Sequence, residues 1–126
     1  MRIMKEYFNK LFSFGPDRIP VIDIEHAEER FYQRFPEIPW SDFKTALEQG
    51  LKVIKNKYHL HPDNYMIVSK SLGIKIPVEL RPDRMNPHKL VFALMTALDA
   101  RQHKFNTHND QTLMVASIDK FIEIIV

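Results

Sequence analysis

The segment from Ser41 to Tyr58 repeats its apolar residues at the spacing of an α-helix, and it constrains the fold more than any other part of the sequence. Its stripe follows a period of about 3.6 residues and consists of Phe43, Ala46, Leu47, Gly50, Leu51, Ile54 and Tyr58. Ser41 is a good N-cap. Glycine costs a helix about 1 kcal/mol relative to alanine, so Gly50 on this stripe predicts that another backbone packs closely against it.

Two further helices are expected before this one. Residues 2–14 place apolar side chains at helical spacing and end at Gly15. This amphipathic segment docks on the core in one interpretation, and in the other it is an arm that binds a membrane surface or a partner. Asp23 then caps a helix that ends before Pro36. The apolar face of that helix consists of Ile24, Ala27, Phe31 and Phe35.

Three more helices are predicted in the second half of the chain. One covers 64–72 and is closed by Gly73. Another covers 87–103, with Asn86 as N-cap and Pro87 at its first position. It contains LVFALMTAL, which is apolar almost all round and therefore marks a central helix with Leu94, Met95 and Leu98 in the core. The last helix begins near Asp110. Its inner face consists of Met114, Ile118, Phe121, Ile122 and Ile125.

Together these segments predict a mainly α fold, in which residues 1–126 form a single compact domain of five or six helices. The exception is IKIPVEL, residues 74–80, where apolar residues alternate with Lys75 and Glu79 as in a strand. Pro77 restricts this segment to an edge strand or an extended segment. Its one plausible pairing partner is 19–24, so a short two-stranded or extended element is all that we expect.

An edge strand leaves backbone donors and acceptors open, so another chain can add a strand to it. We therefore expect 74–80 to contribute to a partner or self-association surface, with plain packing on the core as the alternative. The loop RPDRMNPHK that follows is rich in cations. Its charges are either solvated or contact an anion or an acidic partner. The candidate residues of this partner surface are Lys75, Glu79, Arg81 and Arg84.

The stretch KYHLHPDN raises the question of a metal site, because His59 and His61 have the spacing of a strand-borne ligand pair. A helix end and a turn are the better interpretation here, since a protonated His59 can meet the exposed carbonyls of the preceding helix. No third and fourth ligands stand at a recognisable spacing. We therefore expect no metal.

The segment VSKSLGIKIPV, 68–78, resembles in its first half the opening helix and turn of helix-turn-helix DNA-binding domains. The resemblance covers about ten residues and would imply a recognition helix beginning near Ile76. Pro77 and Pro82 interrupt such a helix. An ordinary helix capped by Gly73 is the alternative.

Composition narrows the chemistry. The chain has no cysteine and only three glycines, which rules out disulfides and argues against a Gly-rich phosphate loop. Neither a G-x-S-x-G nor an H-E-x-x-H motif occurs, so we expect no catalytic residues and no cofactor. A catalytic triad assembled from residues that are distant in the sequence is not excluded by the absence of these motifs. There is no secretory h-region and no run long enough to span a membrane, so a cytoplasmic location is expected.

The net charge is only +2, but the charges are segregated. Acid concentrates at 23–29, and base concentrates both on a candidate basic face and at Arg101, His103 and Lys104; two solvated faces are the simplest explanation. The candidate basic face consists of Lys52, Lys55, Lys57, His59 and His61.

These features favour a small non-catalytic module that binds or inhibits another protein, as immunity proteins, antitoxins and adaptors do. The alternative is a nucleic-acid-binding regulator that uses the basic face and the half motif. A small metal-dependent enzyme is the third option.

Overall fold

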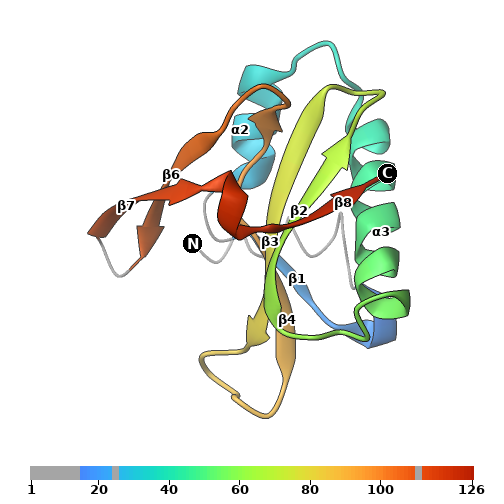
Figure 1. Ribbon diagram of the computed structural model, residues 1–126, viewed down its shortest axis with the longest axis vertical. Helices are drawn as coiled ribbons and strands as arrows, with labels where there is room; N and C mark the ends of the chain where they lie inside the picture. Colours follow the sequence, from blue (N-terminus) through green and yellow to red (C-terminus); the bar gives the residue numbers. More distant parts are fainter. Residues whose placement is uncertain (1–14, 24–25, 110–111) are drawn as a thin grey trace.

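The computed structural model describes residues 15–23, 26–109 and 112–126, and in this part of the chain it has a mixed α/β architecture (Figure 1). The α-helices are α2 (Ala27–Arg34) and α3 (Trp40–Asn56). The strands are β1 (Val21–Asp23), β2 (Asp63–Ser69), β3 (Ile74–Pro82), β4 (Leu90–Leu94), β5 (Leu98–Asp99), β6 (Lys104–Asn109), β7 (Thr112–Ser117) and β8 (Ile122–Ile125). Short 3₁₀ turns occupy Pro16–Arg18 (η1) and Ile118–Lys120 (η2).

The predicted mainly α domain of five or six helices is therefore wrong, and so is its description as an all-α helical bundle. The predicted helix over 2–14 lies outside the described residues.

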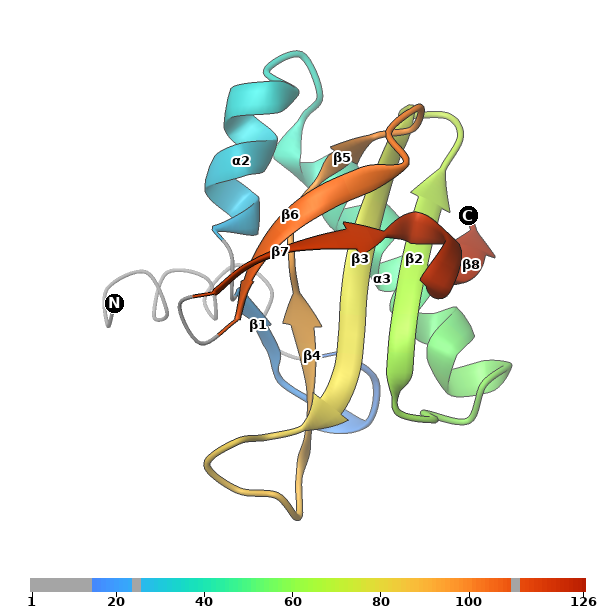
Figure 2. The ribbon, with the colours of Figure 1, turned by 60° about the vertical axis from the view of Figure 1, so that its left-hand side comes forward.

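Six strands form one sheet in the order β1-β4-β3-β2-β8, with β5 pairing beside β3. The pairs β1–β4 and β2–β8 are parallel, and the others are antiparallel. The strands β6 and β7 form a separate hairpin. Figure 2 shows this hairpin crossing the front of the sheet while α3 packs behind it and α2 stands at the side. The sheet thus has a helix-covered face and a hairpin-covered face.

The helix α3 confirms the helix predicted from the stripe of the 43–58 segment. Its buried residues are Phe43, Ala46, Leu47, Gly50, Leu51 and Ile54, which all face the sheet. The prediction for Ser41 is wrong, because Pro39 occupies the N-cap position and no side chain caps this end. The close neighbour of Gly50 is a side chain and not a backbone, since a Cβ at Gly50 would lie 2.3 Å from Cδ1 of Ile67. Glycine here lets α3 approach β2.

The helix α2 confirms the second predicted helix, but it begins at Ala27 with His26, and not Asp23, at the N-cap position. Ile24, which was predicted on its apolar face, lies outside the described residues. The carboxylate of Asp23 accepts hydrogen bonds from the backbone N–H groups of Ala27 at 2.7 Å and Glu28 at 3.3 Å. These are N–H groups that the first helical turn leaves without a partner. Ala27 and Phe31 are fully buried, so α2 also packs onto the helix-covered face.

The three helices predicted after residue 60 are wrong. Residues 63–69 form β2, the region 87–103 contains β4, β5 and loops, and the region after 110 contains β7, η2 and β8. Strands that are buried on both faces read as continuous apolar runs and lose the alternation that identifies a strand, which explains the errors at β2 and β4. In β4, Val91, Phe92, Ala93 and Leu94 are all buried. Asn86 and Pro87 accordingly lie in the β3–β4 loop and start no helix.

The strand β3 confirms the extended conformation predicted for 74–80, but the edge position is wrong, because β3 lies between β2 and β4. The predicted partner is also wrong, since β1 pairs with β4. The carbonyl of Pro77 accepts a hydrogen bond from the N–H of Met95 at 3.1 Å. A strand residue directs its N and C=O to the same side, so the nitrogen of Pro77 points away from β2, where the neighbouring strand changes from β4 to β5. The missing N–H therefore breaks no ladder.

The half motif at 68–78 is a strand hairpin, so its resemblance to a helix-turn-helix does not hold. The strands β2 and β3 pair in antiparallel register from Asp63↔Leu80 to Ser69↔Ile74. Gly73 has a φ of 70° in the turn between them, a conformation that glycine adopts without strain. It ends a turn and not a helix.

Candidate functional site

A pocket of about 160 Å³ lies between α2 and the start of β6, since residues of both elements line it. Thr96 and Leu98, the first residue of β5, form part of its wall, and the buried Phe105 of β6 also lines it. The two α2 residues that line it are Arg30 and Arg34, and the polar residues from the other side are Gln102, Lys104 and Asn106. We call this the α2–β6 pocket.

The two arginines of α2 share one side of the helix because they are four residues apart. The guanidinium of Arg34 is fixed in the pocket wall, since its Nη1 donates to the carbonyl oxygen of Ala97 at 2.8 Å and to Oγ1 of Thr96 at 3.5 Å. Burial, and then the positive charge of Arg30, lower the pKa of Arg34 from its ordinary value. Both causes work against the charged form, and an anion in the pocket would counter them.

Further basic residues lie around this pocket. Nζ of Lys75 on β3 donates to the carbonyl oxygen of Gln102 at 3.4 Å. His103 is exposed between two residues that line the pocket. Arg101 is also close in the sequence, but Asp99 holds it through Nε at 3.1 Å. The basic segment 101–104 therefore lies close to Arg30 and Arg34 of α2.

No aspartate or glutamate is among the described residues that line this pocket. In the described part of the chain, no carboxylate forms an ion pair with Arg30, Arg34 or Lys104. Sequence reasoning missed both arginines, because the acids at 23–29 made this helix look acidic. Their spacing of four residues was the available signal, since it placed two like charges on one helix face. The site can hold an anion by charge and by hydrogen bonds from guanidinium, ammonium and amide groups.

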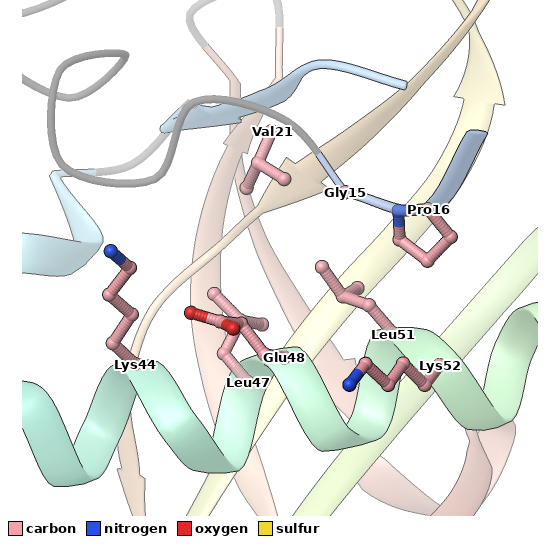
Figure 3. A pocket seen from close by; sticks show the side chains of 8 residues that line it. All are labelled: Gly15, Pro16, Val21, Lys44, Leu47, Glu48, Leu51 and Lys52. Carbon is pink, nitrogen blue, oxygen red and sulfur yellow. The ribbon is translucent and has the colours of Figure 1, made fainter. Parts of the chain in front are cut away.

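A larger pocket of about 370 Å³ lies between α3 and the first described residues (Figure 3). Figure 3 shows Lys44, Glu48 and Lys52 along α3, with Gly15, Pro16 and Val21 on the opposite side. The acid stands between the two bases at intervals of four residues, so it offsets one of their two charges. This pocket has no net preference for an anion comparable to that of the α2–β6 pocket.

The predicted basic face lies at the C-terminal end of α3 and in the turn after it, away from α2 in both ribbon views. Its charges are partly engaged. Nζ of Lys55 lies 2.8 Å from a carboxylate oxygen of Asp17, and Nζ of Lys57 lies 5.5 Å from the centre of the Tyr58 ring. A nucleic-acid role for this face stays a prediction.

The predicted partner surface is divided by the fold. Ile74, Ile76 and Val78 are buried on the helix-covered face, whereas Lys75 and Glu79 are half-buried on the other face. This arrangement agrees with the alternation of apolar residues with Lys75 and Glu79 in the sequence. Oε1 of Glu79 lies 3.3 Å from Nε of Arg81, and Arg84 is exposed in the β3–β4 loop. A role of these residues in partner binding stays a prediction.

His59 and His61 follow the end of α3 in a turn, as predicted. His59 and Leu60 have φ values of 54° and 57°, and the backbone oxygen of His61 accepts a hydrogen bond from the hydroxyl of Tyr65. Within the described residues, no group of three or more potential ligands is suited to a metal ion.

The fold and the α2–β6 pocket define a mixed α/β protein with a pocket lined by positively charged side chains. Comparison of the chain with protein families, with characterised proteins and with solved structures finds no match. None of the described helices is both long enough and apolar enough to cross a membrane.

Proposed function

We propose that the protein binds nucleic acid and that the α2–β6 pocket holds its phosphate backbone. The observation that carries this proposal is the convergence of Arg30, Arg34 and Lys104 on one pocket that no described carboxylate lines. Arginine presents a planar fork of donors that fits phosphate oxygens. We place this activity in the cytoplasm, because the cysteine-free chain suits a reducing compartment.

The arrangement of Arg34 supports a preformed anion site. Ala97 and Thr96 use only Nη1 of Arg34, so the remaining guanidinium donors stay free to face a ligand while the group keeps its orientation. Two arginines four residues apart repel each other by about 0.2–0.5 kcal/mol in an isolated helix. A bound phosphate converts this repulsion into two attractions.

The neighbouring residues favour a polymer over an isolated phosphate. Asn106 offers an exposed amide in the pocket lining, and Lys75 adds charge beside it. Amide side chains can donate to and accept from base edges, and surrounding cations contact adjacent phosphates. With a net charge of +2, the whole-protein field is weak, so binding depends on this local group.

The test is fluorescence anisotropy with labelled single-stranded RNA, single-stranded DNA and duplex DNA of about 16 nucleotides, at about 50 and 200 mM salt. Replacing Arg30 and Arg34 together by Gln is expected to lower affinity at least tenfold and to reduce the salt slope by about 1 to 2. Circular dichroism and urea unfolding of each variant show whether the fold is retained.

The matched control replaces Lys52 and Lys57 by Gln, which also removes two positive charges but from the predicted basic face. This control is expected to bind within about twofold of the original chain. Equal losses in the two double variants would show only a general charge effect, and no binding at low salt would refute the proposal. The expected protein-binding module of immunity, antitoxin or adaptor type, and the expectation that the chain is not an enzyme, stay predictions.

A further inference from the structure

The strand β8 is the last strand on one side of the six-stranded sheet. It pairs in parallel with β2, from Tyr65↔Ile122 to Val68↔Ile125. No described strand pairs with its other side. The outer edge of β8 therefore offers backbone donors and acceptors to another strand.

One hydrogen bond fixes which groups point outward. The N–H of Val126 donates to the carbonyl oxygen of Val68 at 2.9 Å, so Val126 faces β2. Successive residues of a strand direct their N–H and C=O groups to opposite sides. Ile124 and Ile122 therefore also face β2, whereas both backbone groups of Glu123 and Ile125 point to the open edge.

The side chains of this edge are mostly apolar. Natural edge strands are commonly protected by short length, charged side chains, proline or a bulge. The short strand β8 carries one charged residue, Glu123, and the segment Ile122–Val126 has neither lysine nor proline. Ile125 is 53% exposed, although it is a large apolar residue. Ile122, Ile124 and Val126 lie in or against the core of the helix-covered face. An added strand would continue this apolar row.

We propose that a second copy of this chain adds its β8 in antiparallel orientation, with the two Ile124 residues opposite each other on a two-fold axis. In this register Glu123 lies opposite Ile125 of the second copy and Ile125 opposite its Glu123. These are the residues whose backbone groups point outward, so each pair exchanges two N–H···O bonds. The edge is thus complementary to itself, as a two-fold interface requires.

The same register matches the side chains. On the helix-covered face, Ile122 meets Val126 of the second copy, Ile124 meets Ile124, and Val126 meets Ile122. All three are non-hydrogen-bonded pairs, in which side chains come closest. On the other face, the two Ile125 side chains lie diagonally across the junction and within reach of each other. An unrelated strand would have to supply the same apolar order.

Hydrogen exchange gives the first test, together with sedimentation over about 1–300 µM. Sedimentation is expected to show a dimer at high concentration. The amides of Ile124 and Val126 are expected to be protected at every concentration, because they bond to β2. The amides of Glu123 and Ile125 should become protected only where the dimer forms. The proposal would be overturned by a monomer throughout the range, or by hydrogen-exchange rates of these two amides that do not depend on protein concentration.

Two substitutions localise the interface. Ile125→Pro removes an outward N–H and leaves the bonds to β2 in place, and an outward-facing proline is tolerated on an edge strand. It is expected to weaken dimerisation at least tenfold, whereas Ile125→Thr, which keeps the N–H, should weaken it much less. An unchanged dimer in the proline variant would place the contact elsewhere.

The chain has no cysteine, so one introduced cysteine can form a disulfide only between two copies. The Cα atoms of a non-hydrogen-bonded antiparallel pair are about 4.5 Å apart, which is within disulfide range. Ile124→Cys should therefore oxidise to a covalent dimer. Glu123→Cys is the matched control, since the two copies of residue 123 are two register positions apart and beyond the roughly 7 Å limit. Cross-linking of the control alone would overturn the register. If Ile124→Cys fails to fold, the proline and exchange experiments still decide the proposal.

Discussion

The two faces of the sheet differ in how they are covered. Among the described residues, twenty buried residues form the core on the helix-covered face, whereas five form the core beneath the hairpin. On the first face Phe31 and Phe43 pack with ring centres 4.4 Å apart. On the second face Phe105 and Phe121 are 5.6 Å apart, and Phe121 is only partly buried.

This difference separates stability from binding. Apolar burial is the main favourable contribution to folding, so the larger core accounts for most of the stability. The hairpin-covered face has a small apolar centre with charged residues around it, and the α2–β6 pocket lies at that boundary. A site there can change its polar residues without opening the main core.

The largest effect is expected from Leu94→Ala on the helix-covered face. Leu94 is fully buried in β4, and such a truncation removes apolar contacts and leaves a cavity. The free energy of unfolding should fall by about 2–5 kcal/mol, measured by urea denaturation. An unfolding midpoint that does not move would contradict the assignment of the main core to this face.

A smaller effect is expected from Phe105→Ala beneath the hairpin. Phe105 is 5% exposed, but its small cluster at the margin of the protein can relax around the change. We expect a loss of about 2 kcal/mol, below the roughly 3–5 kcal/mol typical of a phenylalanine in a full core. Nucleic-acid affinity should fall in the same variant, because Phe105 supports the pocket. A loss of stability larger than that of Leu94→Ala would reverse the comparison of the two faces.

The smallest effect concerns Asp99, a half-buried residue of β5. Hydrogen bonds from the side chain and backbone of Arg101 lower the pKa of Asp99, and the positive charge of Arg101 adds to this. The folded-state pKa is below the unfolded value, so the stabilisation is present above the unfolded pKa and is lost as the pH falls through the folded pKa.

An NMR titration of the Asp99 carboxyl group checks this directly. The pKa should be lower than usual in the original chain, and Arg101→Gln should raise it toward its ordinary value. An equal pKa of Asp99 in the two proteins would contradict the interaction with Arg101. The Arg101→Gln substitution is not expected to affect the core on the helix-covered face.

The helical stripes of 24–35 and 43–58 were sufficient to predict α2 and α3, because each helix buries one side and leaves the other exposed. The alternation in 74–80 likewise predicted a strand. The other strands of the sheet were not predictable in this way. Ile67 faces α3, but its neighbours Met66 and Val68 are buried on the hairpin-covered face, so β2 lacks a polar side and reads as part of a helix.

The candidate site was less predictable than the fold. Arg101, His103 and Lys104 stood out as a basic concentration, but Arg30 and Arg34 are about seventy residues away in the sequence. Only the packing of α2 against the start of β6 brings the two groups together. The edge position predicted for β3 from Pro77 failed for a similar reason. Pro77 is tolerated inside the sheet because the strand next to β3 changes there from β4 to β5, and this change is visible only in the assembled sheet.

The contact between Gly50 and Ile67 links two residues of different elements into one shared volume. Any side chain at position 50 must take space that Ile67 now fills, since a Cβ there would be 2.3 to 2.7 Å from three of its side-chain atoms. Alanine at 50 is therefore compatible with this separation of α3 and β2 only if residue 67 becomes smaller, even though alanine favours a helix. The side-chain sizes at positions 50 and 67 are therefore coupled, and a larger residue at one position requires a smaller residue at the other.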